Sequence, residues 1–439
     1  MNGIFRIVHV RMVRMVIKEK FPIILIIFLT FVSLVLRAYR LTEPGHYYFD
    51  EVYHAVTAKA YADNNPAAYD PFSPAPKEGT AYDWLHPPLA KLIQAGSIKI
   101  FGDNSFGWRL PSVTFGTAII PLTFILANVL FGSTVAIFAA TVMAFENLAL
   151  VMSRITMNDV FLVVFALSSF IFAVIYVRDG KFKNLFATSL FLGFSVATKW
   201  SGIYVVIAII GYILINKLKK REFDFRPLLL ITLPALIYLA SYSQFWIQGH
   251  SIRQFVDLHK QIWWYQNTRN LKHSYGTTPL YCVPEGLDGP KTWCPWVLNV
   301  RGVYFSYEQY GERAGYIYAL GNPLIFWAGI VAVSYLLGKL IEEKKKELAL
   351  VLVGYFIFWL PWIFAPRILF LYHYLPSLPF LAISLGVSLA TIYQTKLKIF
   401  AFVILAIFMA AFFYFYPISA GYPIIPESID KYIWLSTWR

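Results

Sequence analysis

The sequence predicts an all-α protein that crosses a lipid membrane many times. Of its 439 residues, 58% are hydrophobic and only 14% are charged, and the mean hydropathy is +0.57. A water-soluble domain of this length carries more charge than that. Apolar runs long enough to cross about 30 Å of hydrocarbon also recur along the whole chain. Lipid is therefore the expected solvent.

About eleven of these runs are expected to form membrane-spanning helices, of which the two that flank Lys199 are short. The first run exceeds the hydrophobic segment of a secretory signal and has no small-residue cleavage site, so it should remain as the first span. The runs are Phe21–Tyr39, Leu110–Phe131, Thr134–Val151, Val160–Val177, Leu185–Thr198, Ile203–Ile215, Leu228–Trp246, Leu320–Leu337, Leu348–Phe364, Ile368–Ile392 and Ile399–Tyr416.

Lysine and arginine in the short connections predict the orientation. With eleven spans, all the basic clusters fall on one side, which the positive-inside rule assigns to the cytoplasm together with the N-terminus. The net charge of +14 then reflects these clusters and their contact with membrane lipids, not nucleic-acid binding. The clusters lie at 6–20, 178–183, 217–221, 339–346 and 396–398, which leaves 40–109, 248–319 and 417–439 outside.

The chain 1–439 is expected to form a single membrane domain whose function lies in the two long external loops. In the first loop, Asp50–Asp63 and Pro88–Phe101 show helical spacing of apolar residues, which predicts amphipathic helices on the membrane face. The Pro-rich remainder of both loops predicts ordered segments without regular structure. Cys282 and Cys294, both in the second loop, form either a disulfide or two free thiols, and their spacing alone is no zinc site.

An acidic pair, Asp50 and Glu51, opens the first amphipathic helix just outside the first span. The pair either caps that helix or acts as a general base or a weak cation site, because a carboxylate near lipid is poorly hydrated. His86 and Lys91 begin the second helix, where His86 either makes a structural hydrogen bond or touches substrate. Arg109 follows at the outer end of the second span, as a snorkelling anchor or a phosphate clamp.

Further charges lie at membrane depth, where they are costly and normally pair or line a cavity. Glu146-Asn147 is followed by Arg154 and Asp159, so either a Glu146–Arg154 or Arg154–Asp159 pair or a direct substrate contact is expected. Other polar groups lie near the external ends of later spans. A cavity faced by Arg109, Lys199 and Arg367 would suit an anionic lipid headgroup. The residues expected to bind the donor and its phosphate are Lys91, Arg109, Lys199, Arg367, His373 and Tyr374, with Trp200 in support.

Taken in order, these residues resemble the motifs of the protein O-mannosyltransferases, membrane glycosyltransferases of the GT-C class that use dolichyl-phosphate mannose. Any one match is weak, but the ordered set spans nearly the whole chain. The matches are Phe49-Asp50-Glu51-Val52 with His54, His86-Pro87-Pro88-Leu89 with Lys91, Glu146-Asn147 with Ser153-Arg154-Ile155 and Asp159, Ala197-Thr198-Lys199-Trp200-Ser201-Gly202, Gly321-Asn322-Pro323, and Arg367 with Tyr372-His373-Tyr374-Leu375-Pro376.

The resemblance implies an eleven-span GT-C fold with an extracytoplasmic active site in the cell membrane of a prokaryote, since the lumenal β-trefoil domain of eukaryotic members is absent. It gives Asp50 the role of general base, Glu51 a supporting role and Arg109 an important one. The donor would be a polyprenyl or dolichyl phosphate carrying mannose, and the acceptor a protein Ser or Thr. The enzyme would work alone or as a homodimer or heterodimer.

The reaction that the resemblance implies is direct displacement with inversion at the anomeric carbon. No metal is expected to be obligatory, since the leaving phosphate carries its own charge and cations such as Arg109 and Arg367 would stabilise it. Two alternatives remain open. One is a GT-C enzyme that moves another sugar to a lipid or glycan, and the other is a lipid or sugar transporter.

Overall fold

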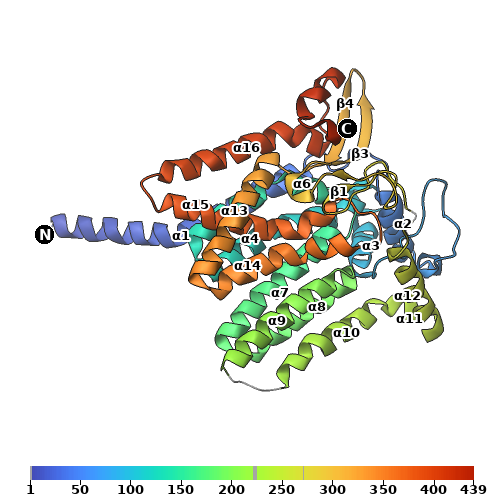
Figure 1. The fold of residues 1–439 in the computed structure, drawn as a ribbon, viewed down its shortest axis with the longest axis horizontal. Coiled ribbons are helices and arrows are strands. Elements are labelled where there is room, and N and C mark those ends of the chain that lie inside the picture. Colours follow the sequence, from blue (N-terminus) through green and yellow to red (C-terminus); the bar gives the residue numbers. More distant parts are fainter. Residues whose placement is uncertain (1, 221–224, 270) are drawn as a thin grey trace.

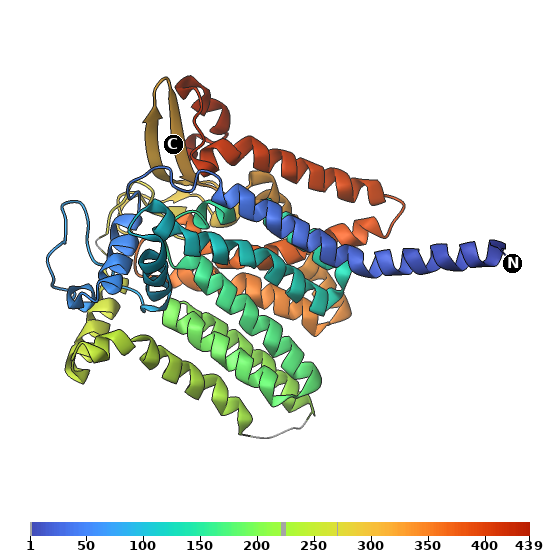
Figure 2. The same cartoon turned by 180° about the vertical axis from the view of Figure 1, so that it is seen from behind.

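The helices of the computed structural model run roughly side by side, and the long connections collect at the end away from the N-terminus (Figures 1 and 2). The structure describes residues 2–220, 225–269 and 271–439, so Arg221 of the predicted basic cluster lies outside them. The long helices are α1 (Asn2–Ala38), α4 (Ser105–Phe131), α7 (Asp159–Asp179), α8 (Phe182–Thr198), α9 (Gly202–Lys220), α13 (Pro323–Glu343), α15 (Leu378–Tyr393) and α16 (Lys398–Ala420).

The multi-pass membrane architecture is confirmed. Within the described residues, seven helices are long and apolar enough to cross a membrane, and three shorter apolar helices accompany them. The predicted number of eleven spans stays a prediction. The seven are Lys20–Ala38, Ser105–Phe131, Asp159–Asp179, Pro323–Glu343, Lys346–Phe364, Leu371–Tyr393 and Lys398–Ala420, and the shorter three are Ser133–Ala144, Gly202–Leu218 and Arg226–Ser241.

The packing core lies between α4, α7, α15 and the shorter helix α5 (Ser133–Ala144). Helices α7 and α15 are apolar all round and buried along most of their length, as expected for helices surrounded by other helices. By contrast, α1 exposes Ile23, Ile27 and Phe31. Exposed apolar residues at this spacing form a stripe that faces lipid.

Two of the predicted spans are interrupted. The run Thr134–Val151 divides at Glu146 into α5 and the short helix α6 (Asn147–Met152), because the Glu146 side chain accepts a hydrogen bond from Ala149 N at 2.6 Å and caps α6. The run Leu228–Trp246 divides at Tyr242 into α10 (Leu229–Ser241) and α11 (Ser243–Ile247). A helix also ends early in the run Leu348–Phe364, where α14 (Lys346–Ile357) gives way to the 3₁₀ helix η4 (Leu360–Phe364).

The first long loop contains the two predicted helices, α2 (Glu51–Ala62) and α3 (Leu89–Phe101). Ala55 and Ala58 of α2 pack with Ile98 of α3 and Trp108 in a buried cluster, and the predicted position of the two helices on the membrane face stays a prediction. Between them, only the 3₁₀ turn η1 (Pro66–Tyr69) interrupts the irregular segment. The two helices therefore form a rigid cap over one end of the bundle.

The second long loop has more regular structure than the sequence suggested. It begins with α12 (Ile252–Gln266), which starts with a capping box at Ser251, and it contains the short pair β1 (Tyr281–Cys282) and β2 (Thr292–Trp293). It ends in the antiparallel hairpin β3 (Val303–Tyr310) and β4 (Arg313–Ala319). The outer edge of β4 is paired with the C-terminal tail through Ala314 and Ile424, so this edge is not open to another chain.

Candidate active site

A cavity of about 810 Å³ opens between the capping helices and the bundle. It is lined by the junction that precedes α2, the segment that precedes α3, the starts of α7 and α9, the end of α12 and the segment 361–373. Several predicted site residues meet there although they are far apart in the sequence. They are Asp50, His54, His86, Asp159, Lys199, Trp200, Arg367 and His373.

Asp50 stands at the entrance to α2 with its side chain free of any capping bond. The preceding Phe49 has a φ of 48°, a strained conformation for a side chain of this size, and its ring stacks on Phe305 of β3 at 4.0 Å. The Asp50 carboxylate accepts a hydrogen bond from the Tyr372 hydroxyl at 3.3 Å. Burial is the main cause that raises the pKa of Asp50 from 3.8 to about 6. Asp50 is therefore a carboxylate with the basicity of a general base.

Glu51 points away from Asp50 and out of the cavity. Its carboxylate is fully buried and lies 2.8 Å from the Arg109 guanidinium, and it also accepts hydrogen bonds from the backbone N and hydroxyl of Thr156. The two carboxylates face different partners in this structure, and the weak cation site predicted from the sequence stays a prediction. Glu51 instead supports the site by joining α2 to α4 and the segment that precedes α7.

Arg109 is bonded to protein groups in this structure, and the prediction that it clamps a phosphate stays a prediction. Besides Glu51, its guanidinium donates to the carbonyl oxygens of Leu41, Pro44 and His46 at 2.8–3.0 Å. The side chain is only 1% exposed, and it does not line the cavity. Arg109 therefore fixes the path of the chain from α1 to Asp50, because it holds three carbonyl groups of that connection.

On the opposite wall, Asp159 and Lys199 form an ion pair at 2.8 Å. Asp159 opens α7, and Lys199 lies at the break between α8 and α9, where the chain ends one helix and begins the next. Trp200 follows, lines the same wall and donates its indole N–H to the Tyr238 hydroxyl at 3.0 Å. The break between the two short predicted spans thus places a cation and an aromatic ring on the cavity.

Arg367 is the cavity cation with the most free hydrogen-bonding capacity. It donates to Gln266 Oε1 at 3.0 Å and to the Ile368 carbonyl at 3.2 Å, and its guanidinium lies over the Tyr265 ring at 5.2 Å. Within the described part of the chain it has no carboxylate partner, whereas Lys199 does. A guanidinium in this situation can still bind phosphate oxygens.

His373 and Tyr374 are adjacent in sequence but point in different directions. His373 lines the cavity beside Tyr372, with ring centroids 4.8 Å apart. Tyr374 is buried in the bundle, where its hydroxyl donates to the Tyr355 hydroxyl at 2.7 Å. Tyr374 therefore does not line the cavity in this structure, where it holds the 3₁₀ helix η5 (Leu371–Ser377) against α14.

Lys91 does not reach the cavity either. It is fully buried and paired with Asp83 at 2.8 Å, and Asp83 also contacts His54. Sequence reasoning missed Asp83, whose one signal was its place three residues before His86 in a segment with few other charges. His54 and His86 both line the cavity with parallel rings 6.1 Å apart.

Glu146, Asn147 and Arg154 form structural contacts and are absent from the cavity wall. Glu146 accepts the backbone N–H of Asn322 at 2.9 Å, and Asn147 donates to the Ser419 hydroxyl at 3.0 Å. Arg154 forms neither of the two ion pairs predicted for it. It donates instead to four backbone carbonyl groups, those of Arg37, Tyr39, Arg40 and Ala420.

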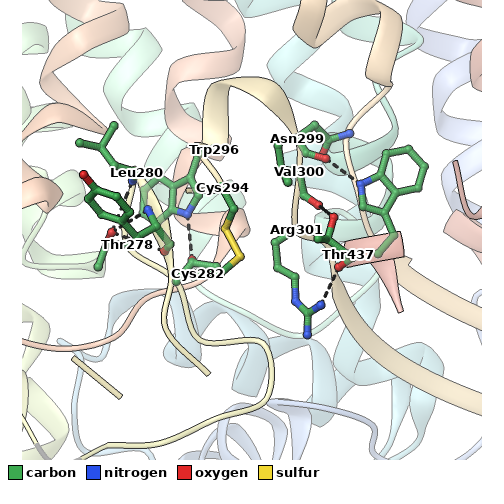
Figure 3. Close-up of a disulfide and its surroundings, with 12 residues drawn as sticks. Thr278, Leu280, Cys282, Cys294, Trp296, Asn299, Val300, Arg301 and Thr437 are labelled. Atoms are coloured by element: carbon green, nitrogen blue, oxygen red, sulfur yellow. Dashed lines mark hydrogen bonds between the residues drawn. A yellow bond between two sulfur atoms is a disulfide. The ribbon is translucent and has the colours of Figure 1, made fainter. Parts of the chain in front are cut away.

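In the second long loop, Cys282 and Cys294 are joined in a disulfide (Figure 3). Beside it, the Trp296 indole donates to Thr277 Oγ1 at 2.9 Å, and Thr277 in turn pairs with Leu369 on the cavity wall. Arg301 donates to the Thr437 carbonyl at 2.7 Å. The loop is therefore tied both to the cavity wall and to the C-terminal tail.

Comparison with known proteins places this geometry in a family. Residues 27–248 match the family described as dolichyl-phosphate-mannose-protein mannosyltransferase, and residues 251–438 match the C-terminal four-transmembrane region of protein O-mannosyltransferase. A polyprenol-phosphate-mannose--protein mannosyltransferase of Mycobacterium tuberculosis is 24% identical over 472 residues, which cover 91% of this chain and 88% of that protein.

The fold matches solved structures of the same class. The Pmt1-Pmt2 protein O-mannosyltransferase complex of Saccharomyces cerevisiae, bound to its sugar donor, aligns with a TM-score of 0.74 at 16% identity and covers 95% of this chain and 92% of that chain. ArnT from Cupriavidus metallidurans, bound to undecaprenyl phosphate, aligns with a TM-score of 0.54 at 16% identity over 89% of this chain and 62% of that chain. The chain has the GT-C fold and belongs to the dolichyl-phosphate-mannose-protein mannosyltransferase family.

Proposed function

We propose that the protein transfers mannose from a polyprenyl or dolichyl phosphate to Ser and Thr hydroxyls of proteins, with inversion at the anomeric carbon. One observation carries the proposal. The cavity holds a carboxylate whose pKa is near neutrality, Asp50, and a guanidinium that has no carboxylate partner among the described residues, Arg367. The cavity volume of about 810 Å³ also lies in the range typical of ligand sites.

In this mechanism Asp50 removes the proton of the acceptor hydroxyl as its oxygen attacks the anomeric carbon. The bond to the phosphate breaks, and the electron pair stays on the phosphate oxygen. Because the leaving group is already a stable anion, the enzyme needs no general acid. Arg367 stabilises the charge that develops on the phosphate, with Lys199 and His373 beside it on the cavity wall. We propose no obligatory metal.

The lipid chain of the donor leaves the cavity on its apolar side. Ile203 of α9 and Phe364 of η4 both line the cavity, and they are 46% and 86% exposed. Large apolar side chains that border both a cavity and the lipid-facing surface suit the passage of a polyprenyl chain. The phosphate would then remain close to Arg367 while the chain lies in the membrane.

We also propose that the N-terminus is cytoplasmic and that the cavity opens on the extracytoplasmic face of a prokaryotic cell membrane. The basic clusters of the short connections support this orientation. A cysteine introduced at Ser73 in the first loop should react with a membrane-impermeant maleimide in intact cells, and one at Lys181 should not. The reverse pattern would invert the proposed topology.

For the acceptor, the names of the curated relatives support protein over lipid.

The yeast structure is a complex of two chains, Pmt1 and Pmt2, and we propose that this protein works as a homodimer or with a related partner. Cross-linking of the membrane-embedded protein tests this, since a single uncross-linked species would refute it.

The decisive experiment uses purified protein in liposomes with polyprenyl phosphate that carries radiolabelled mannose in β linkage, so that inversion gives an α-mannoside. Ser/Thr peptides should gain label, and glycosidase digestion should identify an α-mannoside. Asp50→Asn should abolish the transfer. Asp63→Asn, which changes an exposed carboxylate just after the end of α2, should not. Label that passes only to lipid, or a β-mannoside product, would refute the proposed acceptor or the proposed inversion.

A further inference from the structure

A buried row of three titratable groups extends inward from the cavity wall, where His54 of α2 and Asp83 of the segment before α3 both line the cavity. Lys91 Nζ lies 2.8 Å from Asp83 Oδ2 and also donates to the Asp83 carbonyl oxygen. The same carboxylate oxygen lies 2.9 Å from His54 Nδ1. The three residues are 0%, 4% and 6% exposed, respectively. A lysine and a carboxylate buried this deeply are rare unless they are paired. Here the paired carboxylate also contacts a histidine, and this third contact is not needed to neutralise Lys91.

The orientation of the Asp83 carboxylate is fixed on several sides. Its Oδ1 accepts the backbone N–H of Leu85 at 3.1 Å, and its own backbone N–H donates to the hydroxyl of Thr57 on α2 at 2.7 Å. Burial opposes ionisation of Asp83, but the charges of Lys91, His54 and His86 hold the pKa of this carboxyl well below its usual value. Asp83 is therefore an ionised acceptor aimed at His54.

This contact determines which nitrogen of His54 carries the proton. His54 Nδ1 makes no aligned hydrogen bond in this structure, but the ionised carboxylate 2.9 Å away can only accept one, so it favours the tautomer with the proton on Nδ1. Nε2 is then the ring nitrogen available to take up a proton, and His54 lines the cavity. His54 lies one helical turn after Asp50, and its backbone N–H donates to the Asp50 carbonyl at 3.0 Å. A proton acceptor is thus held on the same wall as the proposed general base.

We propose that His54 is the second proton acceptor of the transfer reaction and that Asp83 is the residue that positions it. The inference rests on the proposed function and extends it. The acceptor O–H bond breaks and Asp50 takes the proton, while the new bond to the anomeric carbon forms and the phosphate leaves with its electron pair. Asp50 then passes the proton to His54 Nε2. The imidazolium is stabilised by Asp83 until the proton is released to water in the cavity.

The other groups around Asp50 are less suited to this step. Asp159 is neutralised by Lys199, Tyr372 already donates its hydroxyl to Asp50, and Asp83 is held by Lys91. His54 lines the same cavity, and its Nε2 is not in contact with Asp83. The groups that act electrostatically on Asp50 are His54 from its own helix, Asp83 from the segment before α3, Tyr372 from η5 and Asp159 from α7.

The proposal can be tested by chemical rescue in the liposome assay. His54→Ala should lower kcat by about 100-fold, within the range for loss of an acid–base group, with the KM for the donor nearly unchanged. Added imidazole should then restore transfer, to an extent that rises with the fraction of neutral imidazole. A purely structural role for His54 would not respond to imidazole in this way.

The role of Asp83 is tested in the same liposome assay, both alone and together with His54→Ala. Asp83→Asn should lower kcat by about 10-fold to 100-fold, and imidazole should not rescue His54→Ala when Asp83→Asn is also present. Because Asp83→Asn leaves Lys91 buried without its partner, the variant Asp83→Asn/Lys91→Met, which removes both charges, serves if the single variant does not fold. Asp63→Asn removes the exposed carboxylate that pairs with Lys59 at 2.8 Å on the same helix, and it should leave kcat unchanged.

The outcomes separate this inference from the function on which it rests. If the wild-type protein transfers no mannose, the proposed function fails and takes the inference with it. If the wild type is active but imidazole does not restore His54→Ala, or restores it equally with Asp83→Asn, only the inference is overturned. Rescue that requires Asp83 would establish both roles.

Discussion

Replacement of Asp50 by Asn should separate catalysis from stability in a single substitution. The amide has nearly the same shape and can still accept the hydrogen bond that the Tyr372 hydroxyl donates at 3.3 Å. It cannot take a proton from an acceptor hydroxyl. Loss of a general base typically lowers a rate by about 10²-fold to 10⁴-fold, and kcat should fall by a factor in this range.

The same variant should not lose stability, although it loses activity. Burial raises the pKa of Asp50 from 3.8 to about 6, so the folded protein holds the proton more tightly than the unfolded chain. At about 1.4 kcal/mol per pKa unit, ionisation of Asp50 opposes folding by about 3 kcal/mol at pH values above the folded pKa. The penalty disappears as the pH falls below the unfolded pKa. Asn carries no charge, so Asp50→Asn should leave the unfolding temperature unchanged or raise it.

The assay combines peptide mannosylation in liposomes with thermal unfolding of the purified protein at pH 7.5, with Asp63→Asn as the matched control. Activity within about threefold of the wild type would refute the role of Asp50 as general base. A strongly lowered unfolding temperature of Asp50→Asn would refute the argument that the ionised Asp50 carboxylate lowers the free energy of unfolding.

Three other predictions concern the same site. The kcat/KM of the wild type should fall about tenfold per pH unit below about pH 6, where Asp50 becomes protonated, and a profile that is flat from pH 5 to 7 would contradict this. Glu51→Gln should destabilise the protein by about 3–5 kcal/mol because it leaves Arg109 buried without a partner, and Glu51→Gln/Arg109→Met should recover part of this loss in thermal unfolding. Arg367→Gln should lower the rate by about 10²-fold to 10³-fold and weaken binding of polyprenyl phosphate, whereas an unchanged affinity would exclude Arg367 from the phosphate site.

Composition and apolar runs were sufficient to predict the membrane architecture, because lipid imposes a length and a composition on every helix that crosses it. They could not predict where a helix is interrupted by its own polar side chain. At the break, the Glu146 carboxylate also accepts the backbone N–H of Asn322, which lies just before the distant helix α13. A contact between segments this far apart in the sequence cannot be read from the local pattern. The hairpin β3–β4 was not predicted for another reason. Exposed and half-buried side chains alternate in part of its tyrosine-rich strand β3, but the prolines elsewhere in the loop favour an irregular segment.

The site could be predicted to the level of residue type but not of side-chain direction. Asp50, Lys199 and Arg367 were assigned to one cavity from their depth alone, and they line one cavity. Arg109 was expected in the same cavity by the same reasoning, yet it is turned toward a buried carboxylate, as is Lys91 at the start of the second loop helix. Depth along a span gives the height of a charge in the membrane, whereas its direction depends on the partner that packs against it.

The most direct test of the central claim is a structure of the protein with a bound analogue of polyprenyl-phosphate mannose. We expect the phosphate to contact the guanidinium of Arg367 and the anomeric carbon of the sugar to face the carboxylate of Asp50 inside the cavity. A phosphate held by Arg109, or a sugar located away from Asp50, would contradict the account.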